Sequence, residues 1–301
     1  MLPLGNDGVS PRSERFANWQ MPVFQVPYFC TMTLRNPARV VWSWLLSLTD
    51  LLERIDIDRR EKLRIALAVM GTKVMRRSPL RFGRLAVHTD NRGSALVILR
   101  EVFLRGDYAF RPATDAPVII DAGANIGIAT LFFKTYYPKA QIIAVEAAGQ
   151  NFAWLKKNIE TNLLTDVTPV LGMLGNRDGV ERDIYFHKRQ PGGSTGRADI
   201  AESKGAKAFV KGSVPGLRLS TLITRDVDLL KMDIEGGEGE VFGELEESGK
   251  LRMIREMVLE YHSNDRVQGN DLCELLDRLK RNGFAVVIYD NERGQFGRSM
   301  K

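Results

Sequence analysis

The sequence predicts an α/β fold built on a doubly wound, mostly parallel sheet, and two observations carry this prediction. After Pro117, short apolar segments typical of buried strands alternate with longer segments that have helical spacing. The first of these strands ends in a turn that contains two glycines, at residues 123–127, and an apolar helix follows directly. With 301 residues, of which 44% are hydrophobic, the chain is long enough for one such domain and an appendage.

The strand and helix pattern repeats along the C-terminal part of the chain. Length and periodicity predict strands at Val118–Asp121, Gln141–Glu146, Val167–Leu171, Leu229–Asp233, Met257–Tyr261 and Ala285–Tyr289. They predict the connecting helices at Ile126–Tyr137, Gly149–Asn162, Gly237–Ser248 and Gly269–Asn282. Residues 180–216 interrupt the alternation with a strand at Asp183–His187 and the stretch QPGGSTGR, so we expect a functional insertion before the fourth strand.

The N-terminal part differs in composition. Residues 1–36 are rich in Pro, Gly, Asn and Ser without periodicity and are predicted to be an irregular arm, whereas residues 37–83 are predicted to be a small helical subdomain. The main domain then covers residues 84–301. Its first segment, residues 84–110, is predicted to form short strands around an Asn91-Arg92-Gly93 turn, with Ala95–Leu99 as an apolar run.

Composition excludes several classes of protein. The apolar run Val40–Leu52 is too short and too polar to span a bilayer, and the N-terminus lacks the features of a secretory signal, so we expect a cytoplasmic protein. The two cysteines lie far apart, which indicates neither a disulfide framework nor a zinc knuckle. The net charge of +6 is dispersed and no reader motif accompanies it, which argues against a nucleic-acid partner.

The segment VIIDAGANIG, residues 118–127, carries the strongest chemical signal. Gly123 and Gly127 permit a close approach of the backbone to a ligand at the carboxyl edge of the sheet. The spacing is D-x-G-x-N-x-G, with Asn125 between the glycines, and it differs from the G-x-G-x-x-G pattern that cradles a dinucleotide pyrophosphate. The motif therefore predicts a nucleotide-like cofactor other than NAD, against the alternative of an ordinary packing turn.

An acidic residue ends each of the first two predicted strands. Glu146 follows Asp121 by 25 positions, where a carboxylate can accept both hydroxyl hydrogens of a ribose. Asp121 would repel a phosphate but suits a cationic amino-acid group, either directly or by orienting the amides of the turn. S-adenosylmethionine has both a free ribose and such a group, so we expect it as the cofactor, held by Asp121, Gly123, Asn125, Gly127 and Glu146.

Over roughly residues 100–290 the chain resembles the FkbM-type family of S-adenosylmethionine-dependent methyltransferases. The resemblance lies in REVFLRGDY (100–108), in the loop 120–127, in LLKMDIEG (229–236) and in LEYH (259–262). The sequence departs from the family pattern at Ala147–Gln150, at Gly237 and at residues 172–179. The resemblance implies the Rossmann-like fold of class I methyltransferases and an O-methyltransferase that acts on a saccharide or a secondary metabolite.

Four residues are candidates for catalysis. Lys231, Asp233 and Glu235 alternate along the predicted fourth strand and past its end, so they would share one side and shift each other's pKa, as proton transfer requires. Alternatively Lys231 simply pairs with Asp233 while Glu235 caps the next helix. His262 ends the following strand and has a pKa suited to a general base. Asp233, Glu235 and His262 lack the close spacing of a metal site, so no metal is expected.

These observations together predict methyl transfer from S-adenosylmethionine to a hydroxyl of a small molecule or saccharide. Asp233, Glu235 or His262 would orient or deprotonate the acceptor, with Lys231 as their electrostatic partner. Two alternatives stay open: a nicotinamide-dependent oxidoreductase, and a non-catalytic module that binds an anionic partner through its basic surface. For the N-terminal helices, a cover over the acceptor pocket and a contact in a homodimer are both open.

Overall fold

A computed structural model describes residues 79–187, 194–196, 198–203, 205–261 and 272–286. Its centre is a five-stranded parallel sheet, which confirms the predicted doubly wound fold. The strands are β3 (Val118–Ala122), β4 (Gln141–Glu146), β5 (Val167–Leu171), β9 (Val227–Met232) and β10 (Ile254–Leu259), in the spatial order β10-β9-β3-β4-β5. The order reverses at β3, so the crevice between the carboxyl ends of β3 and β9 is the switch point at which ligands of such sheets bind.

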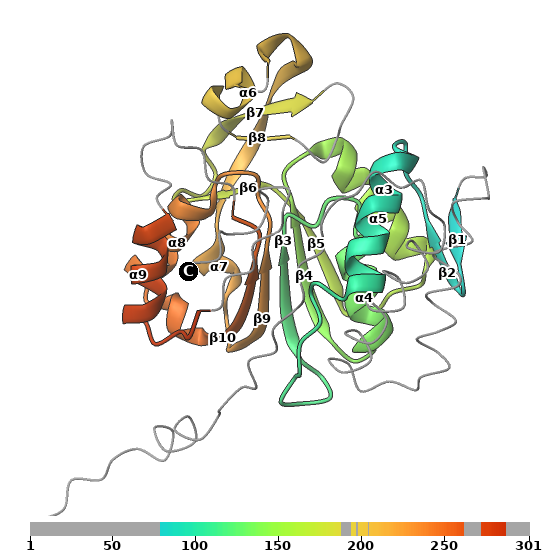
Figure 1. Ribbon diagram of the computed structural model, residues 1–301, viewed down its shortest axis with the longest axis horizontal. Coiled ribbons are helices and arrows are strands. Elements are labelled where there is room, and N and C mark those ends of the chain that lie inside the picture. The colour runs from blue at the N-terminus through green and yellow to red at the C-terminus, as the bar shows by residue number, and fades with distance from the viewer. Residues whose placement is uncertain (1–78, 188–193, 197, 204, 262–271, 287–301) are drawn as a thin grey trace, which may run out of the picture. The chain divides into compact units, whose positions relative to one another are not determined.

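Helices cover both faces of this sheet (Figure 1). On one face lie α3 (Arg92–Leu99), α4 (Ile128–Tyr136) and α5 (Gly149–Thr161), and on the other lie α7 (Leu219–Leu222), α8 (Glu238–Glu247) and α9 (Leu272–Arg281). Neighbouring residues of a strand enter different cores because side chains alternate: Ile119 packs with the first set of helices and Ile120 with the second. Both cores consist of buried apolar side chains, which hold the sheet between the two sets of helices.

The insertion before the fourth predicted strand is a small sheet of its own. It contains β6 (Met173–Gly175), β7 (Glu181–His187) and β8 (Phe209–Arg218), in the order β6-β8-β7, and β7 includes the predicted strand Asp183–His187. The short helices α6 (Ala198–Ser203) and η4 (Ala206–Ala208) lie between β7 and β8. In Figure 1 this unit projects beyond the end of the main sheet.

The structure corrects the prediction for residues 84–110. Only β2 (Leu85–Val87) is a strand there, and it pairs with β1 (Leu80–Phe82) instead of with the apolar run. Asn91 does not form a hairpin turn but caps α3, since its Oδ1 accepts a hydrogen bond from Ser94 N at 3.0 Å. Ala95 and Leu99, four residues apart, are both buried, so the run forms a helix that continues into the π-helix η2 (Arg100–Arg105).

Several other predictions concern segments that lie partly or wholly outside the described residues. Residues 79–83, assigned to the helical subdomain, form β1 and its turn, whereas the predicted arm and residues 37–78 lie outside the described residues. The last predicted strand, Ala285–Tyr289, lies mostly outside them, and residues 285 and 286 are not in a strand. The short 3-10 helix η5 (Lys250–Met253) leads into β10. None of the described helices is long and apolar enough to cross a membrane.

Candidate active site

The loop that follows β3 is fastened to the end of β4. The amides of Gly123 and Ala124 both donate to the carbonyl of Val145, at 2.9 and 2.8 Å. Asn125 has a left-handed φ of 52°, and its amide donates to Glu146 Oε2 at 2.8 Å. The loop therefore has a single shape, set by its backbone hydrogen bonds.

Both glycines of the loop are required by close contacts. Gly123 has a φ of +78°, and a Cβ built there would overlap the carbonyl oxygen of Asp233 at the end of β9. At Gly127, with a φ of +89°, a Cβ would lie 2.7 Å from Leu155 Cδ1 on α5. Gly123 thus lets two neighbouring strand ends touch, and Gly127 lets α4 start against α5.

Glu146 is buried at the end of β4, with 8% of its surface exposed. Its Oε2 accepts from the Asn125 amide, and its Oε1 accepts from the Ala148 amide at 2.7 Å. Burial raises the pKa of this carboxyl, and the two backbone hydrogen bonds partly oppose that rise. Because each carboxylate oxygen has a second lone pair, Glu146 can still accept hydrogen bonds from a ligand.

Asp121 and Lys231 form a buried ion pair beneath the loop. Asp121 is inaccessible to solvent; its Oδ2 accepts from the Thr130 hydroxyl at 2.7 Å, and its Oδ1 lies 3.2 Å from Lys231 Nζ. Lys231 also donates to the carbonyl of Gly123 at 2.7 Å. Of the two roles considered for Asp121, this arrangement favours orientation of the loop over direct contact with a ligand.

Lys231 is a cation in this site. Burial acts to lower the pKa of its ammonium, but the negative charges of Asp121 and Asp233 outweigh burial and the pKa is raised. A lysine with a raised pKa stays protonated near neutral pH and cannot serve as a base. Its ion-pair partner in the structure is Asp121, whereas the sequence predicted Lys231 as the electrostatic partner of Asp233, Glu235 or His262.

A hollow lies at the switch point, between the loop, α3 with η2, and the ends of β9 and β10. It is lined by four of the nine predicted site residues: Gly123, Asn125, Lys231 and Asp233. Its remaining polar side chains are those of Glu101, Asp107, Tyr108 and Glu260. The hollow is therefore predominantly acidic, a character that suits a cationic or hydroxyl-rich ligand.

Tyr108 is the aromatic wall of this hollow. Its side chain is buried, its ring centroid lies 5.5 Å from Lys231 Nζ, and burial together with Asp233 raises its pKa well above the ordinary value. The phenol thus stays protonated and can donate a hydrogen bond. Sequence reasoning left Tyr108, Glu101 and Asp107 out of the site, although they belong to the REVFLRGDY segment, and it left out Glu260 beside His262.

Glu235 takes a different place from the one that strand alternation implied. β9 ends at Met232, and Glu235 has a left-handed φ of 54°, so the two-residue period does not continue to it. It is half-buried and is not one of the residues that line the hollow. Its carbonyl accepts a hydrogen bond from the Thr195 hydroxyl at 2.8 Å. His262 lies outside the described residues.

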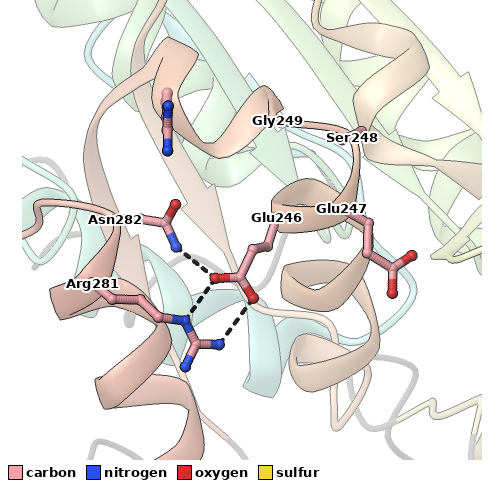
Figure 2. A pocket seen from close by; sticks show the side chains of 7 residues that line it. Glu246, Glu247, Ser248, Gly249, Arg281 and Asn282 are labelled. Atoms are coloured by element: carbon pink, nitrogen blue, oxygen red, sulfur yellow. Dashed lines mark hydrogen bonds and ion pairs between the residues drawn. The ribbon is translucent and has the colours of Figure 1, made fainter.

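A second hollow lies far from this edge, where α8 ends (Figure 2). Its central carboxylate, Glu246, accepts from Arg281 Nε at 2.9 Å and from Asn282 Nδ2 at 2.7 Å. Because α8 runs away from the carboxyl end of β9, its last turn lies near the amino ends of the strands. The Glu246 hollow is thus remote from the glycine loop, and we place the candidate active site at the switch point.

A doubly wound sheet with a glycine loop at its switch point and a buried carboxylate on the adjacent strand defines a domain for a ribose-bearing cofactor. Residues 121–286 match the FkbM methyltransferase domain, and this chain belongs to that family. It is a methyltransferase that uses S-adenosylmethionine, as the sequence predicted, and the oxidoreductase alternative is set aside.

Two curated relatives are methyltransferases by name, in agreement with this assignment. The chain is 28% identical over 215 residues to "Methyltransferase 1" of Beauveria bassiana, covering 64% of this chain and 81% of that protein. It is 29% identical over 229 residues to the 31-O-demethyl-FK506 methyltransferase FkbM of Streptomyces tacrolimicus, covering 65% and 84%. A solved FkbM methyltransferase from Methylobacillus flagellatus is similar with a TM-score of 0.40 and 13% identity, over 81% of this chain and 54% of that one.

Proposed function

We propose that this methyltransferase transfers the methyl group of S-adenosylmethionine to a hydroxyl oxygen of a small molecule, either a saccharide or a secondary metabolite. The acidic hollow at the switch point carries the proposal, because its carboxylates stand beside a loop shaped for close contact. A hydroxyl acceptor must lose a proton, and an acidic hollow offers several groups able to take it. The name of the Streptomyces tacrolimicus relative specifies methylation at an oxygen, which supports the same chemistry.

The residues present fit the cofactor. The position of Gly123 leaves the loop without a side chain at the sheet edge, and Glu146 keeps lone pairs for the two ribose hydroxyls. Gly123, Asn125, Gly127 and Glu146 would hold the cofactor, while Asp121 orients the loop through Lys231. When bound, the cofactor supplies an electrophilic methyl group on a positively charged sulfur. The four carboxylates of the hollow match that positive charge.

The remaining polar residues would act on the acceptor. In the transfer a carbon–oxygen bond forms as the carbon–sulfur bond breaks, and the hydroxyl proton leaves to a base. Asp233, which lines the hollow, is the base or orienting group that we favour, with Glu235 and His262 as the other predicted candidates. Tyr108, held protonated, would donate a hydrogen bond to the acceptor, and Lys231 keeps its charge. Much of the rate would come from alignment of the two reactants.

Calorimetry and a radiolabel assay test the proposal. We expect wild-type protein to bind S-adenosylmethionine and S-adenosylhomocysteine but not NAD, and Glu146→Ala to weaken this binding by at least about tenfold. Glu247→Ala, a change to an exposed glutamate at the far edge of the sheet, should bind like wild type. Absence of binding to the wild-type protein would contradict the cofactor assignment.

The acceptor is tested with methyl-labelled S-adenosylmethionine and paired compounds: cyclohexanol against cyclohexylamine, and a phenol against the matching aniline, with methyl glucoside as a saccharide that carries hydroxyls but no amine. We expect label in the hydroxyl member of a pair, and loss of that label in Asp233→Asn. Label only in the amine members would overturn oxygen as the methylated atom while leaving the cofactor site intact.

A further inference from the structure

Thr195 joins the insertion to the turn that follows β9. Only 1% of its surface is exposed, and its hydroxyl donates to the carbonyl of Glu235 at 2.8 Å. Its own backbone is paired with β7, since Thr195 N donates to Tyr185 O at 3.0 Å and Tyr185 N donates to Thr195 O at 2.8 Å. Thr195 is thus held on the insertion side by strand pairing and meets the active-site turn with its side chain.

The turn that Thr195 meets is a strained one. Glu235 is a non-glycine residue with a φ of 54°, a conformation that persists only where the surroundings enforce it. Two hydrogen bonds support this conformation. The Thr195 hydroxyl donates to the Glu235 carbonyl, and the Gly236 amide donates to the buried Glu238 carboxylate at 3.1 Å. The first of these comes from a segment 40 residues away in the sequence.

The rest of the insertion is fastened to α8, the helix that the turn begins. Arg182 on β7 donates to both carboxylate oxygens of Glu240, at 2.9 and 2.7 Å. Arg218, at the end of β8, donates to Glu244 at 3.1 Å. These contacts fix the small sheet against α8, and the small sheet in turn holds the Thr195 hydroxyl in place.

The position of Thr195 in its own segment is also defined. A Cβ on the adjacent Gly196 would lie 2.6 Å from Met173 Sδ on β6, so this segment passes against β6 at close range. Met173 itself is buried. The segment cannot shift toward β6, which keeps the hydroxyl of Thr195 at the turn.

We propose that Thr195 is a positioning residue for methyl transfer, which holds the turn carrying Asp233 and Glu235 in its strained shape. Asp233 lines the hollow two residues before Glu235, so the shape of the turn decides where its carboxylate stands relative to the acceptor. The role rests on the proposed function, because it assigns Thr195 to the acceptor half of that site. The insertion is then part of the catalytic apparatus.

Three variants test this role. Thr195→Val keeps the size of the side chain but removes the hydroxyl, and Thr195→Ser restores a hydroxyl. Thr135→Val is the matched control, since the Thr135 hydroxyl also donates to a backbone carbonyl, Leu131 O at 2.7 Å, but on α4. The measurements are calorimetry with S-adenosylmethionine, amide exchange of the peptide covering residues 233–238, and kcat and KM for the hydroxyl compounds of the paired panel.

For Thr195→Val we expect amide exchange in residues 233–238 to rise and kcat to fall by about tenfold, the factor set by loss of one hydrogen bond to the partly buried Glu235 carbonyl. The affinity for S-adenosylmethionine should stay within about threefold of wild type, because the hydroxyl does not contact the glycine loop. Thr195→Ser should recover most of the kcat, and Thr135→Val should match wild type in all three measurements.

The outcomes separate this inference from the proposed function. Wild-type protein that binds no S-adenosylmethionine overturns the proposed function, and with it the acceptor role of Thr195. Wild-type binding and turnover with Thr195→Val unchanged in exchange and kcat overturns the inference about Thr195 alone. A Thr195→Val protein with unchanged kcat but lower thermal stability assigns the hydroxyl to the fold and likewise overturns it.

Discussion

Asp121 and Lys231 lie directly opposite each other in the register of β3 and β9, and the Lys231 ammonium is 3.2 Å from Asp121 Oδ1 with both side chains buried. Two buried charges so close to each other are dependent on one another, since neither has water to solvate it. Lys231 also donates a hydrogen bond to the Gly123 carbonyl. The pair thereby connects the stability of the sheet to the shape of the loop that follows β3.

Removal of the lysine should destabilise the protein strongly. In Lys231→Met the Asp121 carboxylate stays buried without its cation, so the free energy of unfolding should fall by about 3–5 kcal/mol. The control Lys211→Met breaks the exposed Lys211–Asp183 pair, which water and salt screen, and should leave the free energy of unfolding close to that of wild type. Urea titrations measure both. Adding Asp121→Asn to Lys231→Met should restore part of the stability, and failure to do so would contradict the account of an orphaned charge.

Gly123 should not tolerate alanine. In Gly123→Ala the new Cβ would overlap the Asp233 carbonyl, so the loop must move and S-adenosylmethionine binding should be lost in calorimetry. The comparison is Gly179→Ala, where φ is +69° but no atom lies within 4 Å of the new Cβ. That variant should lose only about 1–2 kcal/mol, from the left-handed backbone alone, and should bind the cofactor normally. Equal effects of the two changes would refute the steric argument.

Cofactor binding should weaken on acidification because of Glu146. Burial raises the pKa of this carboxyl, so it takes up a proton at a higher pH than an exposed glutamate does. A protonated carboxyl has lost part of its capacity to accept the ribose hydroxyls, so affinity should fall as the pH drops through the raised pKa. The same shift has the opposite sign for folding: its contribution to stability is present at acid pH and is lost as the pH rises through that pKa.

Glu146→Gln is the control for that titration. The amide cannot ionise, so its affinity for S-adenosylmethionine should be lower than wild type at neutral pH and should not vary over the same acid range. If the wild-type and Glu146→Gln proteins show the same pH dependence in calorimetry, Glu146 is not the titrating group.

The Glu246 cluster of Figure 2 should stabilise the fold in a pH-dependent way. Hydrogen bonds from Arg281 lower the pKa of Glu246 to about 2, against burial, which acts to raise it. A lowered pKa contributes stability above the ordinary value of 4.5, and this contribution is lost as the pH falls toward 2. Because the group is partly exposed, Glu246→Gln should cost only about 0.5–1 kcal/mol at pH 7 and clearly less at pH 2, where about half of Glu246 is protonated.

Glu247→Gln removes the same charge from the neighbouring exposed position and serves as the reference. Urea unfolding at pH 7, 4 and 2 gives the free energies of both variants. A constant difference between wild type and Glu246→Gln at all three pH values would show that the stabilisation does not depend on ionisation.

Local signals in the sequence were enough for the sheet and for the glycine loop. Short patterns along the chain were sufficient there: a turn directly after a strand contains Gly123 and Asn125, and the acidic residue at the end of the next strand is Glu146. The Asp121–Lys231 pair could not be predicted in this way, because it depends on the register between β3 and β9, two strands separated by about a hundred residues. The sequence instead suggested Asp233 as the partner, through proximity along one strand.

Helix α3 and Thr195 were missed for different reasons. Only Val97 and Ile98 in the run Ala95–Leu99 favour strands, and burial of Ala95 and Leu99 on one face together with the Asn91 cap decides for a helix. Thr195 lies in a stretch rich in glycine whose spacing carries no chemical pattern. Its importance comes only from the contact with Glu235, which the fold creates.

The contact between Gly123 and the Asp233 carbonyl has a consequence for how this enzyme can change in evolution. Under the proposed function this contact stands between the cofactor side and the acceptor side of the hollow, and a Cβ at position 123 would force the two strand ends apart, so the backbone here offers little room for change. New acceptors must be accommodated by exchange of side chains on the rim of the hollow, such as Glu101 and Asp107, which belong to the segment ahead of the sheet. Enzymes of this kind that differ in substrate should therefore differ in that segment, whereas Gly123 and the backbone at Asp233 should vary little.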